Sequence, residues 1–253
     1  SLFFSWTLRR SSALMPLLSV CVAMVFFTGA GILGLLRPAS YVWYVLCAAA
    51  ALFTILANGK KTVSLVSPGL VLFFVGSAVL ITYFLLTKPM LTHWDEFTFW
   101  GTAAKATGQS GLLYTVAPSN LIAKAYPPGL IVFGYMMQFF VPGGFAEPAF
   151  IACFAVLYLA CLASATAVWD KSPTSALLLF CAMFLLPFLF SEGGGGAMQW
   201  VFQVCMADMP MALIFGGALC FYLAGGGRPG TLLASRRPAA SSAAQEAAAE
   251  GPG

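Results

Sequence analysis

The sequence contains very little charge. Only 8% of its 253 residues are Asp, Glu, Lys or Arg, and 60% are hydrophobic, whereas soluble domains carry about 25% charged residues. So few charges cannot hydrate the surface of a soluble fold, and we expect an integral membrane protein. The formal net charge of +4 is small and spread along the chain, which gives nucleic-acid binding no support.

Clustered metal-binding side chains are also missing. The chain has one histidine, His93, and its seven cysteines lie in apolar segments without Cys-x-x-Cys spacing. We interpret these cysteines as small core hydrophobes and expect no zinc site. A divalent cation stays open as a cofactor, because two or three converging carboxylates can hold one.

Six apolar runs are long enough to cross a bilayer, for which a helix needs about 17 to 25 residues. They cover residues 13–36, 40–58, 66–87, 146–168, 174–191 and 208–226. A seventh run, from Gly129 to Val141, has only about 13 residues, so we expect it to lie at the interface or against the bundle. The predicted fold class is all-α: a polytopic bundle of about six transmembrane helices, with short interfacial helices in a long first outer loop.

Basic residues support this count and orient the chain. With six spans, the basic residues of one side are Arg9, Arg10, Lys60, Lys61, Lys171, Arg228, Arg236 and Arg237, and those of the other side are Arg37, Lys88, Lys105 and Lys124. Short loops rich in Lys and Arg stay cytoplasmic, so both termini are predicted to be cytoplasmic. The same count gathers the acids Asp95, Glu96, Glu147, Glu192 and Asp208 on the outer face.

The chain divides into four predicted segments. Residues 1–87 hold three transmembrane helices, residues 88–145 the outer loop with a first acidic motif, and residues 146–226 three more transmembrane helices with a second acidic motif. Residues 227–253 are rich in Ala, Gly, Pro and Ser and are predicted to be a disordered cytoplasmic tail. Four consecutive glycines at 193–196 predict a flexible connection on the outer side.

The outer loop is predicted to contain two short interfacial helices. In the first, over residues 97–107, helical spacing places Phe97, Trp100, Gly101 and Ala104 on one face. The second follows Pro127-Pro128, since proline is well tolerated at a helix start.

Acidic side chains occur at the ends of two apolar runs. Asp95 and Glu96 follow the third run in the sequence His93-Trp94-Asp95-Glu96, and Asp208 opens the last run. A carboxylate beside a bilayer is costly, which makes each a candidate functional residue. The alternatives are solvated loop acids for the pair and a helix N-cap for Asp208.

The order of these motifs resembles that of a known enzyme family. Asp95-Glu96 is followed by Trp100 and Ala104, Gly111-Leu112-Leu113-Tyr114, Tyr126-Pro127-Pro128-Gly129-Leu130 and Ala207-Asp208-Met209-Pro210. This order is similar to that of the GT-C fold glycosyltransferases that use polyprenyl-phosphate sugars, in particular the dolichyl-phosphate-mannose–protein mannosyltransferase and aminoarabinose-transferase group. The resemblance covers residues 93–225.

The resemblance implies transfer of a sugar from a polyprenyl-phosphate donor to an acceptor on the outer face, with inversion at the sugar. Asp95 would be the general base, Glu96 would orient the site, and Asp208 would fix the acceptor or the loop. Tyr126, Pro127 and Pro128 would shape the path of the lipid by rigidity.

Three more residues are candidates beside these. Lys105 and Lys124 are our own candidates for the donor phosphate, with snorkelling to the headgroups as the alternative. His93 would be a ligand or second base, although a lone interfacial histidine is more often structural.

The sequence also departs from the family. Glu147-Pro148 stands where an arginine is common, and family members continue with further helices. We therefore expect a polytopic enzyme of this kind, or its N-terminal portion, in a bacterial inner membrane, with an additional membrane subunit as a candidate partner. The alternative function is a non-catalytic membrane protein, either a small transporter or a subunit of a glycosylation complex. A transporter predicts charges at the midplane of broken helices, whereas the acids here lie at helix ends.

Overall fold

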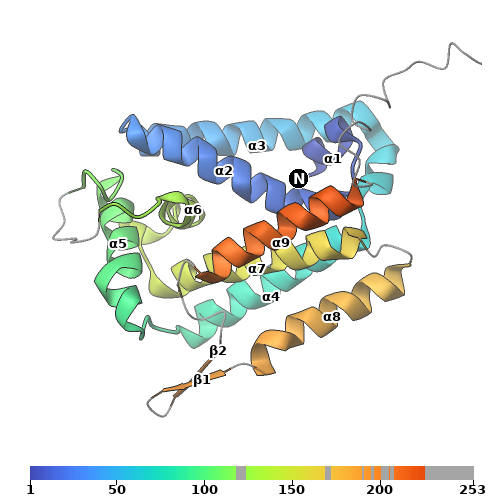
Figure 1. Cartoon of the computed structure of the whole chain (residues 1–253). Helices are drawn as coiled ribbons and strands as arrows, with labels where there is room; N and C mark the ends of the chain where they lie inside the picture. Colours follow the sequence, from blue (N-terminus) through green and yellow to red (C-terminus); the bar gives the residue numbers. More distant parts are fainter. Residues whose placement is uncertain are drawn as a thin grey trace, which may run out of the picture.

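The apolar runs fold into helices, because a helix satisfies its own backbone hydrogen bonds where water is absent. A computed structural model describes residues 1–117, 124–168, 172–189, 191–194, 197–200, 205 and 208–225. Its elements are α1 (Leu2–Leu8), η1 (Ser12–Leu14), α2 (Met15–Ile32), α3 (Leu36–Asn58), η2 (Gly59–Leu65), α4 (Pro68–Thr87), η3 (Glu96–Trp100), α5 (Gly101–Ser110), α6 (Gly129–Met137), η4 (Pro142–Gly144), α7 (Glu147–Val168), α8 (Pro173–Leu189), β1 (Ser191–Gly194), β2 (Ala197–Trp200) and α9 (Asp208–Ala224) (Figure 1).

Four segments of the described chain are long and apolar enough to cross a membrane. They are Ser12–Ile32, Leu36–Leu65, Pro68–Thr87 and Glu147–Val168. The predicted helical membrane protein is therefore confirmed at this level. The runs expected at 174–191 and 208–226 correspond to α8 and α9, which have 17 residues each. A helix of that length spans about 26 Å, slightly less than the hydrocarbon core of a typical bilayer.

Helix α6 is formed by the short apolar run that follows the double proline. It has nine residues, which gives a length of about 14 Å, too short to cross a bilayer. Ile131, Val132 and Phe133 are buried, and α6 packs against α2, α5 and α7. The run after the double proline therefore packs against the bundle, one of its two expected positions.

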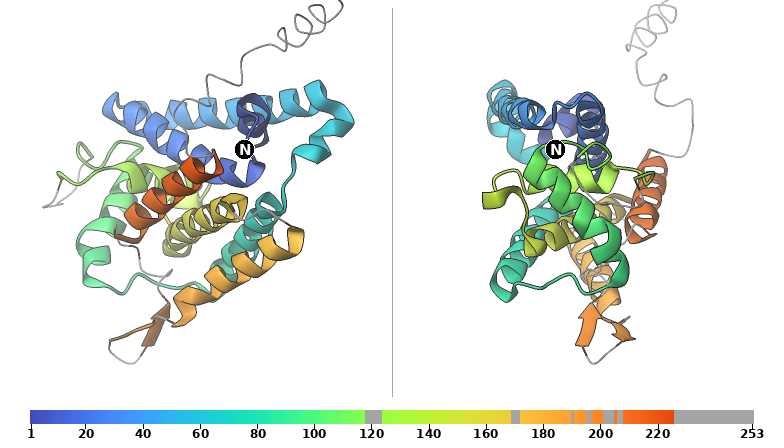
Figure 2. Two further views of the ribbon diagram at one scale, coloured as in Figure 1. Left: turned by 45° about the vertical axis from the view of Figure 1, so that its right-hand side comes forward. Right: turned by 90° about the vertical axis from the view of Figure 1, so that its left-hand side faces the viewer.

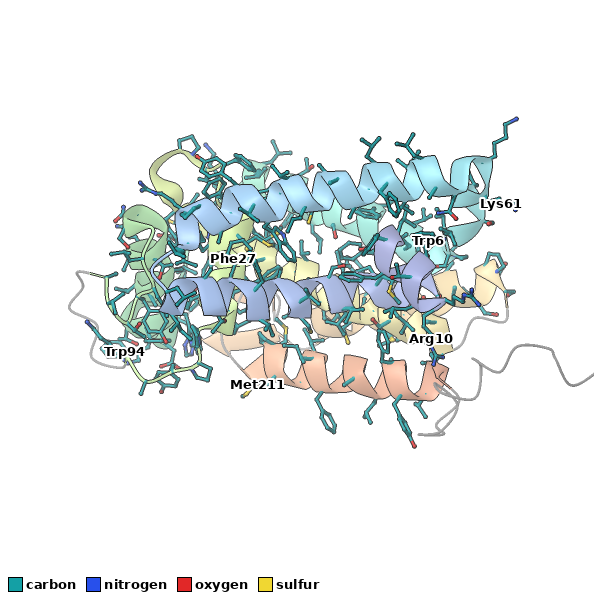
Figure 3. The ribbon with its side chains drawn as sticks, turned by 90° about the horizontal axis from the view of Figure 1, so that it is seen from above. Trp6, Arg10, Phe27, Lys61, Trp94 and Met211 are labelled. Atoms are coloured by element: carbon teal, nitrogen blue, oxygen red, sulfur yellow. The ribbon has the colours of Figure 1, made fainter. Side chains whose placement is uncertain are left out.

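The long helices alternate in direction, so their connections gather at two ends (Figures 1 and 2). We call the end that carries α5, α6 and the β1–β2 pair the loop end, and the opposite end, which carries the N-terminus, the terminal end. Figure 3 shows Trp94 at the loop end and Arg10 and Lys61 at the terminal end. Arg10 donates a hydrogen bond to the carbonyl of Ala224 at 3.4 Å, which ties the end of α9 to the N-terminal segment.

This arrangement agrees with the expected separation of charge where the chain is described. The C-cap of α4 at Lys88 and the first turn of α3, with Arg37, lie at the loop end. Four basic residues of the other predicted set and the predicted tail, residues 227–253, lie outside the described residues: Lys171, Arg228, Arg236 and Arg237.

Helix α7 forms the centre of the core. Of its most apolar 18 residues 78% are buried, whereas 11% are buried in the corresponding 18 residues of the segment Leu36–Leu65. It packs against α2, α4, α8 and α9. A helix that is apolar on all sides is stable only when it is enclosed, as α7 is. The exposed side chains of α3, such as Val45 and Leu46, are the kind that face lipid.

The helix predicted over residues 97–107 is present, but its buried face differs from the prediction. Trp100, Gly101 and Ala104 are buried as expected, whereas Phe97 is 54% exposed and Phe99 is buried. The cause is the π-helical turn η3, in which the N–H of Gly101 donates to the carbonyl of Glu96, five residues earlier. The wider turn rotates the preceding residues. The prediction that Phe97 shares a face with Trp100, Gly101 and Ala104 is therefore wrong.

The glycine-rich segment is described in part, and its flexibility stays a prediction. Strands β1 and β2 pair antiparallel, from Ser191 opposite Trp200 to Gly194 opposite Ala197. Glu192 lies in β1 at the loop end, the side expected for it. Two of the glycines, at 195 and 196, lie outside the described residues.

Candidate functional site

The carboxylate of Glu96 is a buried anchor at the loop end. Its residue is 1% exposed. One oxygen, Oε2, accepts the backbone N–H groups of Thr92 and His93, both at 2.8 Å. The other oxygen, Oε1, accepts the backbone N–H of Cys205 at 2.6 Å. Such charge-assisted hydrogen bonds are what makes a buried carboxylate tolerable.

This anchor joins two segments that are far apart in the sequence. Cys205 lies 109 residues after Glu96 and three residues before Asp208, the first residue of α9. The two acidic motifs therefore approach each other at the loop end. Asp208 is the first residue of α9, one position after a helix N-cap. Its side chain lies outside the described residues, so the N-cap interpretation stays a prediction.

A second carboxylate holds the same loop. Glu147 begins α7, and its Oε2 accepts the backbone N–H of Leu91 at 2.8 Å. An acid in the first turn also suits the helix dipole. Leu91 is buried and lies directly over Gly101, where an added Cβ would collide with its Cδ1. The loop that leads to Asp95 is therefore fixed from two sides.

Asp95 differs from Glu96 in its exposure and in the hydrogen bonds of its carboxylate. It is exposed, and its backbone N–H donates to His93 Nδ1 at 3.4 Å. Within the described part of the chain, its carboxylate accepts no hydrogen bond and forms no ion pair. One acid of the pair is thus locked in the protein, and the other faces outward from a backbone that Glu96 holds.

His93 is part of this local network. It is half-buried, its backbone N–H donates to Glu96, and its Nδ1 accepts from Asp95. These contacts support the structural role of His93.

The ring of Tyr126 packs against the helix that begins with the acidic pair. Its ring centroid is 4.6 Å from that of Phe99 and 5.8 Å from that of Trp100. Its carbonyl accepts the hydroxyl proton of Tyr114. Pro127 is exposed and Pro128 half-buried. The Tyr-Pro-Pro step is therefore fastened to the acidic segment, as the predicted site requires.

The two candidate lysines are not joined to the acids. Lys105 lies on the exposed face of α5, and Lys124 is exposed just before Tyr126. Within residues 1–117 and 124–168, neither ammonium forms an ion pair or a hydrogen bond. Their assignment to a phosphate stays a prediction.

A metal site is not assembled by the described residues. Among them, no group of three or more His, Cys, Asp or Glu side chains could hold a metal ion. The Asp208 carboxylate lies outside that set, so the divalent cation stays open.

Cys205 contributes to the contact with Glu96 through its backbone. Burial raises the pKa of its thiol well above the ordinary value, and the Glu96 carboxylate acts in the same direction. The thiol therefore stays protonated, and the part of Cys205 that matters is its backbone N–H. Nothing in the sequence could have identified this residue, because every residue except proline carries the same donor.

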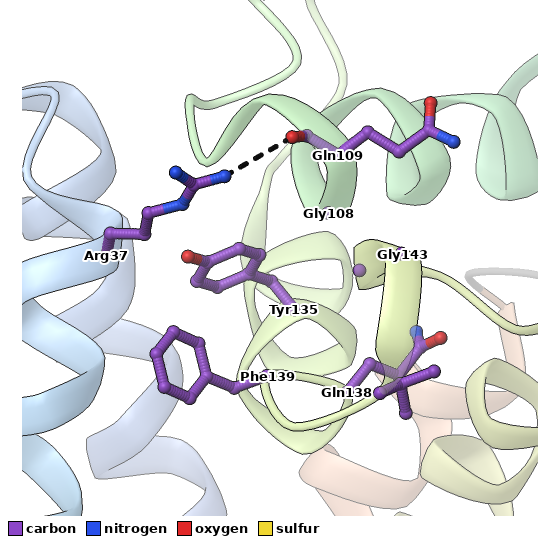
Figure 4. Close-up of a pocket in the computed structure, with 9 residues that line it drawn as sticks. Arg37, Gly108, Gln109, Tyr135, Gln138, Phe139 and Gly143 are labelled. Atoms are coloured by element: carbon purple, nitrogen blue, oxygen red, sulfur yellow. Dashed lines mark hydrogen bonds between the residues drawn. The ribbon is translucent and has the colours of Figure 1, made fainter.

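A pocket of about 300 Å³ also lies at the loop end. Its walls come from the start of α3, the end of α5, α6 and the η4 turn (Figure 4). Arg37 reaches across it, and Tyr135 and Gln138 line it. We call it the Arg37 pocket. The sequence places Arg37 on the outer side but does not mark it as a site residue.

Comparisons with protein family models, with curated proteins and with solved structures found no match to this chain. The assignment of a function therefore rests on the residues and geometry of the loop end.

Proposed function

We propose that this chain is a membrane glycosyltransferase that moves a sugar from a polyprenyl-phosphate donor to an acceptor on the outer face. The observation that carries the proposal is that two adjacent carboxylates differ in burial and in hydrogen bonding. Glu96 is buried and binds three backbone N–H groups, while Asp95 is exposed beside it. An exposed carboxylate on a fixed backbone is what a general base acting on a bound acceptor needs.

In the proposed reaction, Asp95 takes the proton of an acceptor hydroxyl or amine. The acceptor atom then forms a bond to the anomeric carbon of the sugar, and the bond from that carbon to the phosphate oxygen breaks. The polyprenyl phosphate leaves with the electron pair of that bond, and the anomeric configuration inverts. One base is sufficient, because a lipid phosphate is already a good leaving group.

The other candidate residues have supporting roles in this proposal. Glu96 and His93 hold the Asp95 backbone, and Asp208 fixes the acceptor or the loop. Lys105 and Lys124 offset the charge of the donor phosphate. Tyr126, Pro127 and Pro128 form a rigid step for the lipid, which the ring contacts of Tyr126 with Phe99 and Trp100 support.

The proposal includes six spans, with α8 and α9 as the fifth and sixth. Helices of 17 residues fit a bilayer that thins locally by a few Å at modest cost. Both termini would then be cytoplasmic, in a bacterial inner membrane, with the loop end outside. The alternation of helix directions supports this arrangement.

Replacement of Asp95 by Asn tests the proposal. We expect sugar transfer from polyprenyl-phosphate donors, measured in membranes that contain the chain, to fall about 10²- to 10⁴-fold. The matched control is Glu246→Gln, which makes the same carboxylate-to-amide change in the C-terminal tail and should leave transfer intact. Transfer that survives in Asp95→Asn at the level of the control would refute the catalytic assignment.

A non-catalytic subunit of a glycosylation complex is the second candidate. It is favoured by the positions of Lys105 and Lys124, because within the described residues neither exposed lysine is joined to Asp95 or Glu96. In that case Asp95→Asn would leave transfer by the complex unchanged, whereas deletion of the whole chain would abolish it.

A further inference from the structure

The Arg37 pocket has a cation and no anion. Within the described chain, its lining contains the Arg37 guanidinium and no acidic side chain. No carboxylate of a described residue pairs with that guanidinium. A guanidinium is always charged at physiological pH and presents a planar fork of N–H donors. The pocket therefore has uncompensated positive charge.

The guanidinium is held in place by the backbone at the end of α5. Its Nη2 donates to the carbonyl of Gln109 at 3.5 Å (Figure 4). Its stem lies on Gly111, where an added Cβ would be 2.9 Å from Nε and 3.3 Å from Cδ. Gly111 has a φ of +70°, so glycine serves there both the turn and the close approach. These contacts place the guanidinium beside the end of α5, and the Arg37 side chain stays exposed.

Two neutral polar side chains lie around the same space. The Tyr135 hydroxyl points toward the guanidinium (Figure 4). Burial raises the pKa of the Tyr135 phenol, so the hydroxyl keeps its proton. Gln138 is 2% exposed and fixed at both ends of its amide: Nε2 donates to Gly134 at 3.3 Å, and Oε1 accepts from Ala146 at 2.8 Å.

The wall opposite Arg37 is made of backbone. Gly108 and Gly144 approach so closely that a Cβ on either would collide with the other's carbonyl oxygen. Because these residues have no side chains, the space stays open, and because their backbones touch, it does not collapse. The pocket is therefore a built feature of the fold.

An aromatic cluster connects the pocket with the apolar surface of α3. Phe139 lines the pocket, and its ring is 5.0 Å from that of Tyr41 and 6.0 Å from that of Tyr44. Tyr41 and the neighbouring Phe140 are exposed. Exposed aromatic rings at the end of an apolar helix are typical of the headgroup level of a membrane. A ligand that combines an anion with an acyl chain would contact both features.

We propose that the Arg37 pocket binds the phosphate of a lipid headgroup, whose acyl chains lie along the exposed face of α3. The planar fork of Arg37 matches phosphate oxygens, and the hydroxyl of Tyr135 adds a neutral donor. This site is separate from the sugar-transfer site. Asp95 and Gly108 are 13 residues apart on one helical segment, which is about 20 Å along the axis. A donor phosphate in this pocket would be out of reach of Asp95.

The test uses the full chain, purified in a non-ionic detergent, and the short-chain lipid dihexanoyl phosphatidic acid as the probe. Its affinity is measured by titration calorimetry. We expect Arg37→Gln to weaken binding about 10- to 100-fold, the range expected for the loss of a charge-assisted hydrogen-bonded pair. The control is Arg9→Gln, an exposed arginine at the terminal end, which should bind as the unaltered chain does. Equal binding by both variants would overturn the proposal.

Two glycine variants test whether binding depends on where the Arg37 guanidinium lies, with Arg37 itself retained. Gly111 and Gly34 both have a φ of +70°, but an added Cβ meets Arg37 at Gly111 and nothing within 4 Å at Gly34. Alanine strains the backbone similarly at the two sites, and only Gly111→Ala displaces the guanidinium. We therefore expect Gly111→Ala to weaken binding of the probe and Gly34→Ala to leave it unchanged. Equal losses in the two variants would contradict a site built on a positioned Arg37.

Two further ligands identify the source of the phosphate. Dihexanoylglycerol has the same chains without the phosphate, and its binding should not depend on Arg37. Inorganic phosphate should bind far more weakly than the lipid, because it cannot use the aromatic cluster. If inorganic phosphate binds as tightly as the lipid and with the same dependence on Arg37, the lipid assignment is overturned and the pocket takes free phosphate. Asp95→Asn should leave all of these affinities unchanged, which separates this test from that of sugar transfer.

Discussion

The carboxylate of Glu96 accepts the backbone N–H of Cys205 at 2.6 Å, across 109 residues of sequence. The same carboxylate holds the N–H groups of Thr92 and His93. The exposed Asp95 and the start of α9 are therefore positioned by one buried group, and a change in that group affects both.

Replacement of Glu96 by Gln should destabilise the fold. An amide has only one acceptor oxygen, so its NH₂ group would face one of the three backbone donors and leave it unsatisfied. We expect a loss of about 1–3 kcal/mol in the free energy of unfolding, measured by denaturant titration in detergent micelles. Asp95→Asn is the matched control next to it and should change stability little, because Asp95 is exposed. Equal losses in the two variants would rule out the anchoring role of Glu96.

Gly101→Ala should also destabilise the acidic segment. A Cβ at Gly101 would collide with Leu91 Cδ1 and lie 2.8 Å from the Glu96 carbonyl oxygen. Such overpacking costs about 1–3 kcal/mol. The control is Gly29→Ala in α2, where an added Cβ meets nothing within 4 Å and alanine should be neutral or stabilising. Thermal unfolding of the two variants compares them directly, and a stable Gly101→Ala would show that Leu91 moves freely.

The thiol of Cys205 should make stability depend on alkaline pH. Burial and the Glu96 carboxylate raise its pKa well above the value of 9.0 expected in an unfolded chain. Above about pH 9 the unfolded chain therefore releases a proton that the folded chain keeps, so stability falls as pH rises. Below pH 9 the thiol is protonated in both states and contributes no slope.

The comparison that isolates this effect is the difference between the unaltered chain and Cys205→Ala. Denaturant titrations at pH 7, 9 and 10 should show a steeper alkaline loss of stability in the unaltered chain. Parallel curves would mean that Cys205 is not buried against Glu96.

Labelling of single cysteines should separate the two ends of the bundle. Trp94 is exposed at the loop end and Lys61 at the terminal end. Tyr126 is also exposed, and its ring lies beside that of Trp100. In a chain whose seven native cysteines are replaced by Ser, a membrane-impermeant maleimide added to right-side-out vesicles should label Trp94→Cys and Tyr126→Cys but not Lys61→Cys until the membrane is opened. Labelling of all three from outside would contradict the proposed topology. Position 96 is unsuited to this experiment, since Glu96 is buried.

The sequence is sufficient to predict most of the helices, because their apolar character and length dictate them. The start of α4 at Pro68 and of α8 at Pro173 follows from proline at a first helical position. Residue spacing failed at Phe97, because spacing assumes an α-helix and the chain forms a π turn at Glu96–Trp100. The deviation depends on packing around Trp100 and Leu91, which no local pattern records.

The acidic site could be predicted in part. The convergence of the two acidic segments followed from counting spans, and the contact between Glu96 and Cys205 agrees with it. The different states of Asp95 and Glu96 could not be predicted, because adjacent acids look alike in a sequence and only tertiary burial separates them. The sequence places Glu147 on the same face as the other acids but gives it no role, whereas in the structure it binds the loop before Asp95.

The bond between Glu96 and Cys205 has a consequence for biosynthesis. Contacts between residues far apart in sequence form late, after the intervening chain has been made. The loop that bears Asp95 is translated long before Cys205 leaves the ribosome, so until then Glu96 lacks one of its three partners. The nascent protein therefore passes through a stage in which its first helices have been made while the contacts of Glu96 are still incomplete.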